Sequence, residues 1–198
     1  MNTASVFAVC SYCKSTLVRH DIDVELLGQM AALNDSWSPL QLGTQGTFER
    51  AHFVLVGRVR LRWDRGTWDE WYCSYDDGRM GWLSEAQGVY HLSFPAQSTR
   101  EIPPREDVRA GTSVTIDGVA YEITDVKDAS VVYSEGELPF RALPGRKSLS
   151  VDLTSTNSGF ASIDYSVDGV SAYCGAYLKF KDLRFAFLRE LDGWGKPR

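Results

Sequence analysis

Two cysteines near the N-terminus, Cys10 and Cys13, have the spacing of a metal-binding turn. A tetrahedral zinc ion takes four ligands, and a Cys-x-x-Cys turn supplies two of them. His20 is a candidate for a third ligand, and no fourth stands nearby. The pair therefore indicates either a zinc ion shared with another chain, which would make the protein a homo-oligomer through this turn, or a hairpin with two free thiols. We expect no other cofactor.

Polar residues on either side of Trp82 are candidates for a ligand pocket. Paired carboxylates can act as general acid and base. Turn geometry accounts for Asp76 and Asp77 without such a role. Glu85 and Gln87 fit no turn rule, and we expect these two to line a polar pocket beside Trp82.

A second acidic set, formed by Glu135, Glu137 and Asp164, lies in the second half of the chain. These carboxylates could bind a polyamine or another cation. The alternative is a solvated acidic loop.

Three arginines, Arg58, Arg60 and Arg62, alternate along one predicted strand and therefore share a face. Three guanidinium groups could hold an anionic surface, such as lipid headgroups or an acidic partner. The alternative is cross-strand pairing with Asp69, Glu70 or Glu49 on a solvated face.

Four tryptophans gather in one hairpin region, at positions 63, 68, 71 and 82. Exposed, they would form a recognition patch, since aromatic residues are enriched at interaction hot spots. Trp63 and Trp71 fall on apolar faces, which favours the core instead. We expect Trp68 to be the most exposed of the four, with Trp82 as a second candidate for contact with a ligand or partner.

No motif for an enzyme accompanies these residues. The chain has no nucleophile elbow, phosphate loop, zinc-protease helix or dinucleotide fingerprint. Its three histidines belong to no motif. We therefore predict that the protein is not an enzyme.

Strands must position most of the candidate residues. Residues 53–63 alternate between an apolar and an arginine-bearing face, which is typical of a half-buried antiparallel strand. Asp77-Gly78 is a hairpin signal. Further strands are expected over 68–75, 80–83, 89–94, 114–116, 119–126, 130–133, 148–153, 160–166 and 170–177. Residues 21–34 have helical spacing, with Val24, Leu27 and Ala31 on one face.

A polar segment with three prolines, residues 95–109, divides two weakly similar halves. We therefore predict a mainly β fold of two tandem small antiparallel β-barrel or bent-sheet units, SH3-like or similar, with a short N-terminal helix. The expected domains are a Cys-pair hairpin and helix over 1–36, a first β unit over 37–98, and a second over 105–191.

Charge and hydropathy limit the location and the partners. The net charge is −5, whereas proteins that bind nucleic acid usually carry a basic excess, so we expect no nucleic acid partner. We see no signal peptide and no apolar run of the roughly 20 residues that a membrane helix needs. The four cysteines are then expected to be reduced, and the protein cytoplasmic.

Four motifs carry a resemblance to a known family. They are Trp68-Asp-Glu-Trp-Tyr72, followed by Gly81-Trp-Leu-Ser-Glu-Ala-Gln-Gly88, and in the second half Glu135-Gly-Glu-Leu-Pro139 with Phe160-Ala-Ser-Ile-Asp-Tyr165. Over roughly residues 38–190 the chain resembles a bacterial family known only as a domain of unknown function, DUF family 4178, here in tandem copies. Residues 4–18 resemble the second half of the zinc ribbon that precedes this domain in some members.

The resemblance implies a context rather than an activity. Members of the family tend to be encoded near polyamine-synthesis genes, small membrane proteins and envelope-stress proteins. We therefore expect a non-enzymatic interaction or scaffold module that contacts a protein partner or a membrane-associated assembly. The alternative is a protein that binds or senses a small ligand, a polyamine or another cation, through Glu85 and the acidic set of the second half.

Overall fold

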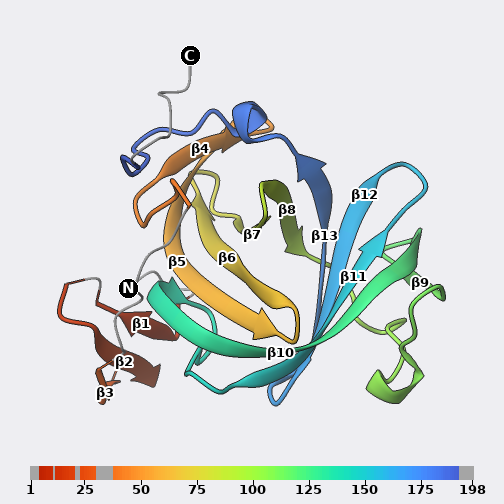
Figure 1. Ribbon diagram of the computed structural model, residues 1–198, viewed down its shortest axis with the longest axis horizontal. Helices are drawn as coiled ribbons and strands as arrows, with labels where there is room; N and C mark the ends of the chain where they lie inside the picture. The colour runs from red at the N-terminus through yellow and green to blue at the C-terminus, as the bar shows by residue number, and fades with distance from the viewer. Residues whose placement is uncertain (1–4, 11, 21–22, 30–37, 192–198) are drawn as a thin grey trace.

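The computed structural model describes residues 5–10, 12–20, 23–29 and 38–191, which contain thirteen strands of one antiparallel sheet (Figure 1). The strands are β1 (Phe7–Val9), β2 (Ser15–His20), β3 (Asp23–Gln29), β4 (Gln45–Phe48), β5 (Ala51–Trp63), β6 (Gly66–Tyr75), β7 (Met80–Ala86), β8 (Val89–Pro95), β9 (Ser113–Ile116), β10 (Val119–Leu138), β11 (Lys147–Thr154), β12 (Gly159–Ser166) and β13 (Gly169–Leu178). Two short 3-10 helices, η1 (Arg105–Asp107) and η2 (Phe180–Leu183), complete the described elements.

Hydrogen bonding closes eight of these strands into a ring. The sheet order is β3-β2-β1-β10-β11-β12-β13-β8-β7-β6-β5-β4, and β10 also pairs with β5. The path from β10 to β5 therefore returns to its own beginning. Strand β10 makes this closure because it is long enough to pair in turn with β9, β11, β5 and β1; it runs along the lower part of Figure 1 from β9 to β5.

Glycines allow the backbones to approach where the ring closes. A side chain at Gly57 would overlap the carbonyl oxygen of Glu137, and one at Gly136 would overlap that of Val56. Gly136 also has a φ of +72°, which glycine adopts without strain. At the β13–β8 pairing, a side chain at Gly175 would overlap the Leu92 carbonyl oxygen. Strand glycines of this kind mark a close backbone approach.

The mainly β prediction is confirmed, and the N-terminal helix is wrong. Residues 23–29 form β3, which pairs with β2, and the remainder of the expected helix, residues 21–22 and 30–34, lies outside the described residues. Pairing with a neighbouring strand has overridden a helical spacing that was weak evidence by itself. No helix in the described ranges has the length and apolarity needed to cross a membrane.

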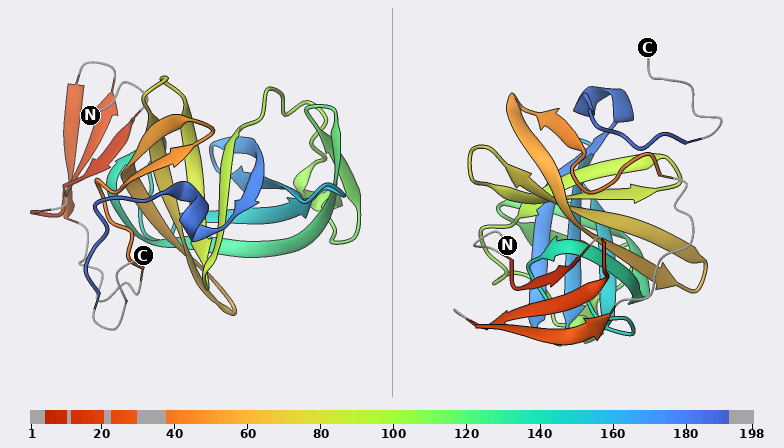
Figure 2. Two further views of the ribbon diagram at one scale, coloured as in Figure 1. Left: turned by 90° about the horizontal axis from the view of Figure 1, so that it is seen from above. Right: turned by 90° about the vertical axis from the view of Figure 1, so that its left-hand side faces the viewer.

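The two tandem units are not confirmed, because one sheet runs through both halves of the chain. Strand β10 joins β5, and β13 joins β8, across the expected boundary. The three-strand group β1–β3 lies at one end of an elongated molecule and the β9 hairpin at the other (Figure 2). The domain limits at 36, 98 and 105 remain a prediction.

Apolar residues on the outside of the ring are covered by segments that do not belong to it. Val151 and Ile163 pack in a cluster with Val114 and Ile116 of β9. On the opposite side of the ring, a second cluster, which contains Leu83, is covered by residues from the 38–44 segment and from the C-terminal segment around η2. Because side chains alternate along a strand, these covers leave the other face of each strand turned to the inside.

We predict that Gly175→Ala lowers the free energy of unfolding by about 1–3 kcal/mol or more, because the added methyl group meets a backbone carbonyl that cannot move alone. Gly159→Ala is the matched control, since the close contact of its methyl group would be with the Ser155 hydroxyl, the end of a side chain, and not with a backbone carbonyl. Urea denaturation measures both. Equal losses for the two variants would contradict the close approach of β13 and β8.

Candidate functional site

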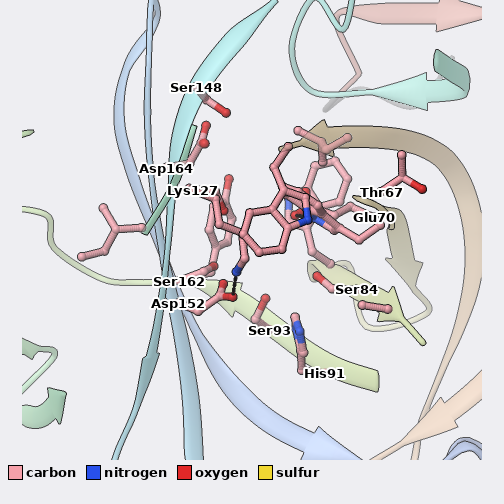
Figure 3. A pocket seen from close by; sticks show the side chains of 18 of the residues that line it. Thr67, Glu70, Ser84, His91, Ser93, Lys127, Ser148, Asp152, Ser162 and Asp164 are labelled. Carbon is pink, nitrogen blue, oxygen red and sulfur yellow. Dashed lines mark hydrogen bonds and ion pairs between the residues drawn. The ribbon is translucent and has the colours of Figure 1, made fainter. Parts of the chain in front are cut away.

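A cavity of about 290 Å³ lies inside the ring, and all eight ring strands contribute residues to its wall (Figure 3). Small-molecule sites in proteins usually measure roughly 300–1,000 Å³. The cavity is therefore at the small end of that range. Exposed lining residues, among them Arg65, Thr67 and Gln87, come from the β5–β6 and β7–β8 hairpins and place the open side of the cavity at these two turns.

Serine side chains leave this space open. Five serines from four strands line the cavity: Ser84, Ser93, Ser148, Ser150 and Ser162. On β11 the alternation is regular, because Ser148, Ser150 and Asp152 face the cavity whereas Leu149 and Val151 belong to the apolar cluster covered by β9. An interior of small polar side chains cannot fill itself as an apolar core does.

Aromatic rings form much of the remaining wall. Trp63, Trp68, Trp82, Phe140 and Tyr173 all line the cavity. The ring centroids of Trp82 and Phe140 are 6.1 Å apart, which is within the range of favourable aromatic pairs. Such faces can pack against an apolar chain or attract a cation.

Two carboxylates of the wall, Glu70 and Asp164, have no ion-pair partner among the residues that the structure describes. Trp68 Nε1 donates a hydrogen bond to Glu70 Oε1 at 3.0 Å, but the indole is uncharged and does not balance the carboxylate charge. Burial, together with the negative charges of Asp164 and Asp152, raises the pKa of Glu70 to about 7. Burial also raises the pKa of Asp164, although Ser148 and Arg146 partly offset it.

The cations of the wall are matched by other acids. Lys127 Nζ binds Asp152, the pair joined by a dashed line in Figure 3, and lies 3.0 Å from Asp125 Oδ2. Arg146 Nη2 lies 2.9 Å from Asp168 Oδ2. Arg65, at the exposed β5–β6 turn, lies 3.8 Å from Asp64 Oδ2. None of these three cations forms an ion pair with Glu70 or Asp164 among the residues that the structure describes.

His91 adds a polar atom without a partner. Its Nδ1 is buried and has no hydrogen bond in the described part of the chain, and its ring stacks on Phe160 at 3.8 Å between centroids. Burial lowers the pKa of His91 to about 4, so the imidazole is neutral at pH 7. A neutral imidazole can donate or accept a hydrogen bond there.

Five of the residues singled out from sequence line this cavity: Trp63, Trp68, Trp82, Gln87 and Asp164. Glu85 lies on the opposite face of β7. It accepts hydrogen bonds from Ser38 Oγ at 2.6 Å, Trp71 Nε1 at 3.2 Å and Tyr90 Oη at 3.0 Å. In this position Glu85 ties the 38–44 segment to the outside of the ring.

Two of the three arginines pair across strands, and Asp69 is one of the partners predicted for them. They do so in a buried cluster that includes Glu135, not on a solvated face. Arg58 Nη2 lies 2.9 Å from Asp69 Oδ2, Arg58 Nη1 lies 3.2 Å from Glu135 Oε1, and Arg60 Nη2 lies 2.6 Å from Asp69 Oδ2. The Arg58 guanidinium also covers the Trp71 ring at 4.7 Å. Burial alone would raise the pKa of Asp69, but the hydrogen bonds from Arg60 and Arg58 outweigh it and hold that pKa low. This cluster is a buried connection between β5, β6 and β10.

Two further predicted residues lie apart from both groups. Arg62 is exposed and stands opposite Thr67 in the β5–β6 pairing. Glu137 accepts a hydrogen bond from Ser5 Oγ at 3.1 Å, beside β1. The structure does not bring Glu137 to Glu85 or to the cavity.

Cys10 and Cys13 occupy the turn between β1 and β2. Lys14 N donates to Cys10 O and Cys10 N donates to Ser15 O, both at 2.9 Å, and Lys14 has a φ of 57°. Both thiols are free, and Cys13 is exposed. Within the described ranges no three His, Cys, Asp or Glu side chains gather as metal ligands, and the His20 side chain lies outside what is described.

Sequence reasoning missed Glu70, His91, Lys127 and Asp152 as members of one site. The signal was present in the alternation of residues 147–154, where serines and an aspartate occupy one face. A polar face of that kind normally indicates solvent. Only the cover formed by β9 shows that it faces a cavity.

We predict that Glu70→Gln makes the ligand-free protein less sensitive to pH. Because the pKa of Glu70 is higher in the folded protein than its ordinary 4.5, folding takes up a proton and the stability of the wild type falls as pH rises from 4.5 to 7. Relative to the wild type, E70Q should gain roughly 1–3 kcal/mol across this window, at about 1.4 kcal/mol for each pKa unit.

Urea denaturation at several pH values measures this difference. Glu122→Gln, which removes an exposed carboxylate on β10, is the control and should run parallel to the wild type. A constant difference between E70Q and wild type from pH 4.5 to 8 would contradict a buried, unpaired Glu70.

Comparison with known proteins gives one match. The model of a family described as "Domain of unknown function (DUF4178)" matches residues 41–180. No curated protein and no solved structure gives a significant match.

Proposed function

The chain belongs to the DUF4178 family, a domain of unknown function, and we propose from its site that it is a non-enzymatic protein that binds or senses a small ligand inside the ring of strands. The cavity of about 290 Å³ carries this proposal. Its wall combines aromatic faces with two carboxylates that lack an ion pair and one buried imidazole nitrogen that lacks a hydrogen bond, all among the described residues. Apolar walls with a few such polar groups are typical of ligand sites.

The interior polarity supports a ligand rather than a core. Ser93 and Ser84 are buried and line the cavity, at positions where a closed sheet would normally place apolar side chains. Serines at these positions leave a volume that apolar side chains would fill, and a bound molecule could occupy that volume and use the hydroxyl groups.

The placement of the tryptophans and arginines makes a surface scaffold the weaker alternative. A scaffold at a membrane-linked, envelope-stress or polyamine-associated assembly would use exposed aromatic and basic residues. Trp82 is buried, Trp68 donates to Glu70 at the cavity wall, and Arg58 is paired below the surface. A cytoplasmic location suits a receptor for an internal metabolite and belongs to the same proposal.

Native mass spectrometry and thermal unfolding test the function. Protein purified without denaturation is expected to carry a small bound molecule, or to gain thermal stability with members of a panel of amines, sugars, organic acids and nucleosides. Ser162→Leu, which fills the cavity, should abolish both effects, whereas Ser113→Leu, at an exposed position of β9, should retain them.

Two results would count against ligand binding in the cavity. Binding that survives Ser162→Leu unchanged would place the ligand elsewhere. Absence of any bound molecule, with no stabilisation by any panel member, would overturn the proposal.

We separately propose that the turn between β1 and β2 holds half of a zinc site shared by two chains. The exposed Cys13 forms a hydrogen bond with Ser15 at 3.2 Å, and hydrogen bonding lowers the pKa of its thiol to about 7. Two thiolates from one chain do not complete a tetrahedron, whereas two such turns do.

Elemental analysis combined with light scattering checks this second proposal. We expect one zinc ion for two chains and a dimer, both lost in Cys10→Ser and both kept in Cys174→Ser, whose cysteine lies on β13. A zinc-free monomer, or a dimer that persists in Cys10→Ser, would show that the turn is a plain hairpin.

A further inference from the structure

We propose that the ligand is a small organic cation with a primary ammonium group, held between Glu70 and Asp164 while its apolar chain packs on the tryptophans of the wall. This inference rests on the proposed ligand-binding function and assigns the class of ligand. It follows from which charged residues of the cavity wall already have an ion-pair partner and which do not.

The ion pairs already present in the cavity wall indicate that the ligand carries a positive charge. Lys127 is held by Asp152 and Asp125, and Arg146 by Asp168, so neither cation is available to an anionic ligand without breaking an ion pair. The third cation of the wall, Arg65, is exposed at the β5–β6 turn, 3.8 Å from Asp64. Glu70 and Asp164 have no such partner among the described residues. Ionising a carboxylate in a confined space away from water costs free energy unless a cation is close. An ammonium group that enters the cavity would supply that cation to both Glu70 and Asp164.

The two carboxylates interact with each other. The charge of Asp164 is the largest of the neighbouring charges that disfavour ionisation of Glu70. Glu70 lies on β6 and Asp164 on β12, on opposite sides of the ring of strands. Both line the same cavity, as Figure 3 shows. A cation between them would relieve this repulsion, which no neutral ligand could do.

Aromatic faces beside the carboxylates favour an organic cation over a metal ion. Trp68 is bound to Glu70 through its indole N–H, and Lys127 Nζ already lies 5.5 Å from the Trp63 centroid and 5.9 Å from that of Trp68. The wall thus accommodates an ammonium of its own within cation–π distance. In addition, no three potential metal ligands meet in the described residues.

His91 supplies a further polar contact. Its buried Nδ1 is without a partner among the described residues, and burial keeps the imidazole neutral near pH 7. A neutral imidazole can accept a hydrogen bond from an ammonium, whereas an imidazolium would repel it. The observation is independent of the carboxylates and places a hydrogen-bonding atom without a partner on the wall of the same cavity.

Calorimetry with three four-carbon probes tests the class of ligand directly. Putrescine, 1,4-butanediol and succinate share a chain length and differ in charge. At pH 7.5 and constant ionic strength we expect putrescine to bind with one site per chain, and the diol and the diacid to bind at least tenfold more weakly. Binding of putrescine should tighten from pH 6 to pH 8, as Glu70 loses its proton.

Variants distinguish this site from general attraction to an acidic protein. Glu70→Gln and Asp164→Asn should each weaken putrescine binding roughly 10- to 100-fold, the loss typical of a hydrogen bond to a charged group. Glu122→Gln, at the surface of β10, should leave it unchanged. Circular dichroism shows that each variant is folded before its binding is measured.

The possible failures are distinct. Diol or succinate binding as tightly as putrescine, or E70Q binding putrescine like the wild type, overturns the assignment of a cation and leaves ligand binding in the cavity intact. If no probe binds and the cavity-filling variant Ser162→Leu also changes nothing in the wider panel, the proposed function itself falls.

Discussion

The pairing of β10 with β5 is the contact on which the rest of the structure depends. It returns the sheet to its own beginning, so that eight strands enclose a volume that an open sheet would leave to solvent. Gly57 and Gly136 permit this pairing because any side chain there would overlap a carbonyl oxygen of the facing strand. The buried cluster of Arg58 with Asp69 and Glu135 reinforces the same junction.

Closure also decides which faces of the strands are inside. The outer faces bury their apolar residues against β9 and against the terminal segments, so the core of this protein lies partly outside its ring. The inner faces are then free to carry serines, carboxylates and tryptophans. Glu70 and Asp164 bear the electrostatic cost of that arrangement, and the proposed cation offsets it.

Local pattern predicts the strands well and their partners poorly. The alternation of residues 53–63 and the turn at Asp77-Gly78 correspond to β5 and to the β6–β7 hairpin. Between Val119 and Leu138 the sequence pattern predicts two strands. The structure has one, because pairing first with β11 and then with β5 sustains it. The role of Glu85 could not be read from sequence, since its donors Ser38 and Tyr90 come from other elements. Site residues such as Glu70 could not be predicted from sequence, because the ring that brings them together closes through pairing between strands far apart in the chain.

The ionisation of Glu70 tests the central claim most directly. Carbon-13 NMR of the Glu70 side-chain carboxyl, followed from pH 4 to 9, should show a pKa near 7 in the ligand-free protein. Addition of putrescine should lower that value, because an ammonium beside the carboxylate favours its charged form. A pKa near the ordinary value of 4.5 in the ligand-free protein, or a raised one that putrescine leaves unchanged, would contradict a cation site inside the ring.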